Sequence, residues 1–275
     1  MFKFSKKKSS IEDQYKKELE ALGLSTLNDL EELLRPLVKE ATQVIAKKST
    51  SIPKDSNLKS QFGGNPFFEK GEKWPKAKNG NELEFVFQVF NSKDICLHDD
   101  IALVQFFYDY RTEQEGNMPF ETDDDGWHVK IYKTVNKDSI TIIDKPKNHD
   151  NVKYCDIEFK KIKSLPYWES VDAYNENISK LSTVLNPKEP WESFESARVG
   201  IIGRTQDTDE ECYLTQFGGY PTWMQGEEEF EGKDCEFLFQ IYSEDNANLM
   251  WGDAGLVYIF LDKKTKKLEF VLQCG

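Results

Sequence analysis

The sequence Gln-Phe-Gly-Gly-x-Pro occurs twice in this chain of 275 residues, at 61–66 and again at 216–221. Two further pairs of similar segments follow in the same order, 84–90 with 236–242 and 103–109 with 256–262. The three pairs are separated by 152 to 155 residues. Chance rarely preserves both order and spacing, so the sequence predicts that two stretches of the chain fold alike.

The paired segments are rich in aromatic and β-branched residues, and Gly, Pro, Asn and Asp flank them. This composition is typical of short β-strands joined by turns. Before the first repeat, apolar residues recur at helical spacing, and Ser9 with Glu12 and Thr26 with Asp29 match capping boxes. The predicted class is α+β, mostly antiparallel β with N-terminal helices, built from two pseudo-equivalent repeats.

The repeats set the expected domain boundaries. Residues 1–40 should form an N-terminal helical segment and 41–275 a single duplicated α+β domain. Within that domain we expect repeat one at about 41–110, a connecting region at 111–195 and repeat two at about 196–275.

Three segments need separate interpretation. Residues 42–47 could end a helix or form a strand, and the similarity of 44–48 to 201–205 favours strands at both places. The alternating sequence at 127–135 is typical of a strand, and a helix introduced by Pro166 is expected at 164–185.

Each central strand of the repeats carries one amide. In 84–90, period two places Phe85, Phe87 and Val89 on one face and Val86, Gln88 and Phe90 on the other. Both faces are otherwise apolar, and Gln240 stands at the equivalent place. A buried amide costs a few kcal/mol unless its polar atoms are bonded. We therefore expect Gln88 and Gln240 to bond the backbone of the two Gly-Gly-x-Pro turns.

The turns consist of Gly63, Gly64 and Pro66 and of Gly218, Gly219 and Pro221. Adjacent glycines permit positive φ and close approach of another backbone, which is a structural use. Phosphate binding is the functional alternative. It is disfavoured because the Lys-Ser/Thr of a P-loop is missing and no helix signal follows.

Together with Trp74-Pro75, the strand containing Gln88, Trp251-Gly-Asp-Ala-Gly255 and Cys274, these turns resemble the YwqG-like family, a bacterial domain of unknown function. The resemblance covers about residues 40–275. It implies an intracellular protein with one duplicated α+β domain, and it supplies no catalytic residues. The sequence departs from the family at Glu84 and in an acidic insertion at Asp123 to Asp125.

The net charge of -13 bears on the class of partner. Such a field repels phosphate backbones, so nucleic acid is not expected, whereas a basic protein is favoured. The same charge would also simply keep a cytoplasmic protein soluble. The five cysteines include no Cys-x-x-Cys pair, and neither a signal peptide nor a membrane span is evident. We therefore expect a reduced, cytoplasmic protein, whose oligomeric state the sequence leaves open.

No catalytic constellation stands out. His98, His128 and His149 lack a second ligand at helical spacing, so no metal site is expected. Cys155 and Cys235 stand beside acidic residues that would raise a thiol pKa. We expect no catalytic residue and no cofactor.

Acidic residues bracket the second turn, and no Lys or Arg lies between Thr205 and Gly232. Solvated loops are the plainer interpretation, and a calcium loop lacks its Asp/Asn alternation. The binding hypothesis is an acidic, aromatic surface made by Tyr220, Trp223, Glu227 and Glu228 that docks a basic protein, as in a bacterial toxin and immunity pair.

The alternative function is an enzyme or small-ligand-binding protein. Its site would lie between the two repeats, where Trp251 and Asp253 should approach the Gly-Gly turns. Both residues also have sufficient structural explanations, because Asp253 can cap a turn and Trp251 can pack below it.

Overall fold

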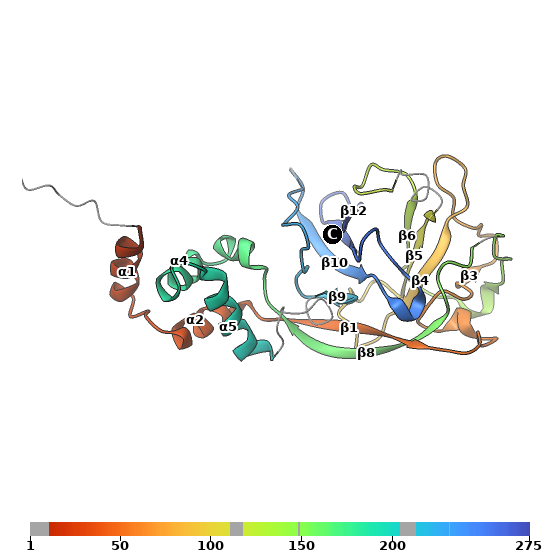
Figure 1. Ribbon diagram of the computed structural model, residues 1–275. Coiled ribbons are helices and arrows are strands. Elements are labelled where there is room, and N and C mark those ends of the chain that lie inside the picture. Colours follow the sequence, from red (N-terminus) through yellow and green to blue (C-terminus); the bar gives the residue numbers. More distant parts are fainter. Residues whose placement is uncertain (1–10, 111–117, 148, 204–212, 231) are drawn as a thin grey trace, which may run out of the picture. The chain divides into compact units, whose positions relative to one another are not determined.

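The computed structural model describes residues 11–110, 118–147, 149–203, 213–230 and 232–275 (Figure 1). The chain divides into two compact units, a helical unit from 1–39 and 163–212 and a sheet unit from 40–162 and 213–275. The helical unit thus takes residues from two distant parts of the sequence, and not only from the N-terminal segment 1–40 that the sequence predicts.

The helical unit contains α1 (Ile11–Ala21), α2 (Leu27–Leu34), η1 (Arg35–Leu37), η4 (Trp168–Ala173), α4 (Glu176–Leu185) and α5 (Pro190–Ile202). The capping box of Thr26 and Asp29 is present at the start of α2. The box predicted at Ser9 lies outside the described residues. Leu19, Leu30 and Phe194 are buried in a common apolar core, which is what the spacing of leucines along α1 and α2 predicts. None of the helices described is long and apolar enough to cross a membrane.

Two predictions for this unit need correction. A strand was expected at 201–205, of which the structure describes 201–203. This prediction is wrong, because Ile201 and Ile202 end α5. Pro190 begins this helix, and Ile201 is buried in the helical core. The helix expected at 164–185 is broken into η4 and α4, because the side chain of Asn175 caps a new start by accepting from the N–H of Asn177.

The described residues of the sheet unit form twelve strands: β1 (Lys39–Lys48), β2 (Gln61–Phe62), β3 (Phe68–Glu69), β4 (Glu84–Phe90), β5 (Leu103–Tyr108), β6 (Trp127–Tyr132), β7 (Ile140–Thr141), β8 (Cys155–Ser164), β9 (Gln216–Gly218), β10 (Cys235–Tyr242), β11 (Leu256–Asp262) and β12 (Leu268–Gln273). Ten of them form one mostly antiparallel sheet in the order β12-β11-β10-β9-β1-β8-β2-β4-β5-β6, and β3 pairs with β7. The strands expected at 42–47, 84–90, 103–109, 236–242 and 256–262 are therefore present, and the strand expected at 127–135 ends at Tyr132. Short 3-10 turns lie at η2 (Ser56–Leu58), η3 (Lys137–Ser139) and η5 (Asp245–Ala247).

The ten-stranded sheet curls into a nearly closed barrel, with the long strands β1 and β8 in the middle of the order (Figure 1). Its two edges approach each other. Trp127 of β6 stacks on Phe270 of β12 with ring centroids 4.9 Å apart, and Glu121 forms a bridge to Val271. The main core of the unit includes Phe62, Phe87, Phe106, Phe217, Phe239 and Trp251. Aromatic side chains from many strands therefore fill it.

The predicted faces of β4 are wrong at two positions, Phe85 and Val86, because Val86 lies in the main core with Phe87 and Val89. A bulge between Phe85 and Phe87 shifts the register against β5. Phe87 and Val89 join the main core, whereas Phe85 packs with Trp74 and Phe107 in a separate cluster. The extra residue of a bulge reverses the alternation of side chains, which strict period two cannot anticipate.

Candidate functional site

The first Gly-Gly-x-Pro turn is bonded to the sheet by Gln88. Its Oε1 accepts from the N–H of Phe67, the residue after Pro66, at 2.9 Å. Its Nε2 donates to the carbonyl oxygens of Asn57 and Lys59 at 3.2 and 2.8 Å. The fully buried amide is thus bonded at both ends, to residues that flank the turn on its two sides and not to the turn residues themselves.

Gln240 does the same at the second turn. Its Oε1 accepts from the N–H of Thr222, the residue after Pro221, at 3.0 Å. Its Nε2 donates to the carbonyl oxygen of Leu214 and to the hydroxyl oxygen of Thr222, at 2.8 and 2.6 Å. Both strands therefore hold the residue that follows the proline.

The carbonyl group of that residue is also bonded. Gln105 Nε2 donates to the carbonyl oxygen of Phe67, and the hydroxyl of Tyr258 donates to that of Thr222, each at 2.8 Å. Gln105 and Tyr258 lie beside Gln88 and Gln240 on the next strand. The amide of Gln105 and the phenol of Tyr258 thus both donate to the carbonyl group of the residue after the proline. Because the two residue types differ, comparing the repeats by residue identity does not reveal this equivalence.

The glycines of both turns have positive φ, +54° at Gly63, +73° at Gly64, +65° at Gly218 and +75° at Gly219. A Cβ atom at Gly63 would lie 2.8 Å from backbone atoms of Val152 and Lys153. At Gly218 it would lie 2.7 Å from Cβ of Cys96. These glycines therefore face neighbouring protein segments, and close packing accounts for them without a phosphate ligand.

The aromatic residues predicted for a docking surface are buried. Tyr220 is 6% exposed and Trp223 is 4% exposed, so the expectation of exposed rings at these positions is wrong. Trp223 lies 4.8 Å from Tyr258 and stacks on Phe260 at 5.7 Å between ring centroids. Trp223 thereby fixes the segment that follows the turn against Tyr258 and Phe260 of β11.

Trp251 is completely buried, with its ring 4.9 Å from that of Tyr108 and 5.9 Å from that of Phe106. Asp253, two residues later, is exposed. Trp251 and Asp253, the two residues predicted to share a ligand site, therefore lie in different surroundings. Trp251 packs in the core, whereas Asp253 faces solvent.

The acidic segment and Asp253 do come together, at the C-terminal end of β12. Gln273 Oε1 accepts from the N–H groups of Met224 and Gln225 at 3.0 Å, and its Nε2 donates to the carbonyl oxygen of Gly226 at 2.9 Å. The N–H of Gly275 donates to the carbonyl oxygen of Asp253 at 3.0 Å. Exposed carboxylates at this end are Glu227, Glu228, Glu229 and Asp253, which we name the acidic end.

The acidic insertion lies along the same strand. Besides the bridge from Glu121 to Val271, the N–H of Leu272 donates to the carbonyl oxygen of Phe120 at 2.9 Å. Phe120 is 45% exposed and Met250, beside Trp251, is 47% exposed. The sequence did not predict that either side chain is exposed. For Phe120 the available signal was its place next to the acidic residues that follow it.

The first half carries a different electrostatic arrangement. Glu72 Oε1 lies 2.7 Å from Nζ of Lys130, and the hydroxyl of Tyr132 donates to Glu72 Oε2 at 2.7 Å. Burial lowers the pKa of Lys130 and raises that of Tyr132, which keeps the phenol protonated. Lys130 also lies over the rings of Phe68 and Tyr132. These contacts fasten the loop after the first turn and neutralise its carboxylate.

In the part of the chain that the structure describes, no group of three or more His, Cys, Asp or Glu side chains is arranged to hold a metal ion. Five acids of the segments bracketing the second turn lie outside those residues: Asp207, Asp209, Glu210, Glu211 and Glu231.

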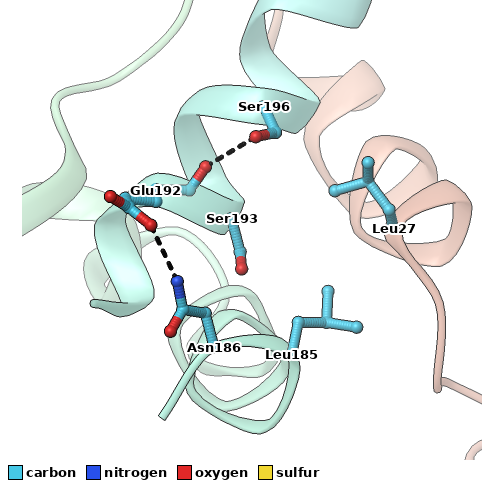
Figure 2. A pocket seen from close by; sticks show the side chains of 6 residues that line it. All are labelled: Leu27, Leu185, Asn186, Glu192, Ser193 and Ser196. Carbon is cyan, nitrogen blue, oxygen red and sulfur yellow. Dashed lines mark hydrogen bonds between the residues drawn. The ribbon is translucent and has the colours of Figure 1, made fainter. Parts of the chain in front are cut away.

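A hollow of about 320 Å³ lies in the helical unit (Figure 2). Leu27 and Leu185 line its apolar side, and Asn186, Glu192, Ser193 and Ser196 line its polar side. It is formed by the start of α2, the end of α4 and the first turns of α5. Sequence reasoning missed it, because no motif marks these residues.

A family model described as domain of unknown function (DUF1963) matches residues 60–270. No curated protein shows a significant match to the chain.

Proposed function

The chain belongs to the DUF1963 family, and we propose that it is a non-catalytic binding or regulatory protein whose acidic end docks a basic segment of a protein partner. The observation that carries the proposal is the set of three hydrogen bonds from Gln273 to the backbone of residues 224–226. They fix the backbone that leads directly into the exposed Glu227, Glu228 and Glu229. Binding then costs less ordering of the loop.

Charge supports a basic partner. No Lys or Arg occurs in residues 213–230, and Glu228 bonds weakly to Gln273 Nε2 at 3.5 Å. By contrast, Glu72 in the loop after the first turn is paired with Lys130. The loop after the second turn thus presents exposed acids on a stretch that contains no basic residue of its own, and a cationic partner would complement it.

Apolar contact adds a second element of recognition. Phe120 approaches the end of β12 through its bond to Leu272, and Met118 lies near Gly252, two residues after the exposed Met250. Aromatic and Met side chains are typical anchors of binding surfaces, whereas exposed ion pairs alone contribute little. The partner segment should therefore be both basic and apolar.

The finer assignments belong to the same proposal. We take the chain to be a YwqG-like, duplicated protein, on the ground that Gln88 and Gln240 make matching bonds at matching turns. The described cysteines, Cys96, Cys155, Cys235 and Cys274, are free thiols, which fits a reducing cytoplasm. A basic toxin held inactive by this acidic protein is one pairing with the required chemistry.

The test is calorimetric titration with a synthetic peptide of alternating Lys and Leu at low salt. Glu227→Gln, Glu228→Gln and Glu229→Gln combined should weaken binding about tenfold, since each exposed charge pair contributes a few tenths to one kcal/mol. Asp99→Asn, Asp100→Asn and Asp138→Asn combined remove the same charge from other exposed positions and form the control.

Equal weakening by both triple variants would show that only net charge matters and would overturn the site. Affinity capture from native cells supplies the second test. Stoichiometric recovery of one basic protein by the wild type, and its loss with the Glu triple variant, is expected. Retention of no protein at low salt would count against the function itself, because charge attraction is strongest there.

A further inference from the structure

We propose that the hollow in the helical unit is a binding site for a primary alkylammonium group, with Glu192 facing the ammonium and Leu27 and Leu185 taking the alkyl chain (Figure 2). The site lies in a different unit from the acidic end, so this proposal does not rest on the proposed function.

The size and lining of the hollow fit a short aliphatic chain. Its volume of about 320 Å³ is roughly ten times the space that one water molecule occupies in the liquid. Figure 2 shows Leu27 and Leu185 on one side, and the hydroxyl of Ser193 is directed toward Leu185 and Asn186. Leu27 is 40% exposed, so a bound alkyl chain would remove apolar surface from water.

The carboxylate of Glu192 is held in position. Glu192 Oε2 accepts from Nδ2 of Asn186 at 2.9 Å, and the hydroxyl of Ser196 donates to the backbone carbonyl oxygen of Glu192 at 2.8 Å (Figure 2). A carboxylate fixed by one neutral donor keeps acceptor capacity for another.

The charges select a cation. A side-chain hydrogen bond to Glu192, together with the charge of that carboxylate, raises the pKa of Glu189, so the two acids lie close together. In the described part of the chain neither carboxylate takes part in an ion pair within 4.0 Å, although ion pairs occur elsewhere in this unit, as between Lys180 and Glu18. An ammonium group would relieve the repulsion, whereas an anionic ligand would increase it.

The experiment is an NMR titration of the full chain at pH 7 with n-hexylamine, which is protonated at that pH. Saturable shifts are expected for the methyl groups of Leu27 and Leu185 and for the amide of Ser193. Hexanoate should leave these signals unchanged, and hexanol should bind at least fivefold more weakly. Glu192→Gln should weaken hexylamine binding at least fivefold, whereas Glu20→Gln, an exposed acid on α1, should not change it.

A second variant, Leu185→Ala, removes the apolar side and should also weaken binding, with circular dichroism checking that the helices persist. A Lys-containing peptide and its Nζ-acetylated form then separate a protein side chain from a free amine as the source of the ammonium. Hexanol binding as tightly as hexylamine, or unchanged affinity in Glu192→Gln, would overturn the proposal. So would shifts that fail to saturate.

Discussion

Gln240 accepts a hydrogen bond from the backbone N–H of Thr222 at 3.0 Å, so that an amide on a central strand holds the residue immediately after Pro221. Gln88 makes the equivalent bond to Phe67. Both amides are completely buried. Since a buried amide without partners is costly, the turn and the strand stabilise each other.

Replacing Gln240 by Leu should destabilise the fold by about 1–3 kcal/mol, because the N–H of Thr222 and the carbonyl of Leu214 would lose their partner in the interior. Gln240→Glu should cost more, since it buries a charge. Urea midpoints measure both effects. Unchanged stability in Gln240→Leu would contradict a structural role for the amide.

Gly63→Ala should destabilise more than Gly203→Ala. Both glycines have φ in the left-handed region, +54° and +67°, and therefore share the strain of an L-residue in that region. Only at Gly63 would the new methyl group meet backbone atoms, at 2.8 Å, whereas nothing lies within 4 Å at Gly203. The difference in thermal midpoint isolates close packing. If both variants lost the same thermal stability, backbone strain alone would explain the effect and the close packing at Gly63 would not contribute.

The repeated segments were sufficient to predict β4, β5, β10 and β11, because strongly apolar strands carry their own signal and each copy supports the other. The same reasoning failed at Ile201. There a short apolar resemblance to β1 competed with a helix that begins at Pro190, and burial in the helical core decided the outcome.

The candidate sites were less predictable. Trp223 stands among acids in the sequence, which suggested an exposed ring, but Tyr258 and Phe260 from another strand bury it. The anchoring of residues 224–226 by Gln273 joins positions 47 to 49 residues apart. Such contacts depend on the completed sheet, and no local pattern encodes them.

Cys155 should resist alkylation in the folded protein. Its thiol is fully buried and donates to the carbonyl oxygen of Asn246 at 3.0 Å, and burial raises its pKa to about 11. Because the thiolate is the reactive form, iodoacetamide at pH 8 should modify Cys155 about 100-fold more slowly than the partly exposed Cys274. Peptide mass spectrometry measures the two rates. In urea they should converge; similar rates in the native protein would refute the buried placement.

Glu84 should make stability depend on pH. It is 2% exposed, and its carboxylate accepts from the N–H of Val152 at 2.9 Å and from Nδ2 of Asn151 at 2.7 Å. Burial raises its pKa, and these hydrogen bonds offset that rise only in part. Because the pKa of Glu84 is higher in the folded than in the unfolded chain, its neutral carboxyl group stabilises the fold, and this stabilisation is fully present below the unfolded pKa. It is lost as pH rises through the folded pKa.

Glu84→Gln removes this titration and keeps an oxygen to accept from Val152. The variant should therefore gain stability relative to the wild type as pH rises from about 4 to 8, the range in which a raised glutamate pKa lies. Urea midpoints at a series of pH values measure the difference. Glu20→Gln, at an exposed position, controls for the loss of one charge. Parallel curves of stability against pH for Glu84→Gln and the wild type would mean that the pKa of Glu84 is the same in the folded and the unfolded chain. The argument that burial raises this pKa would then fail.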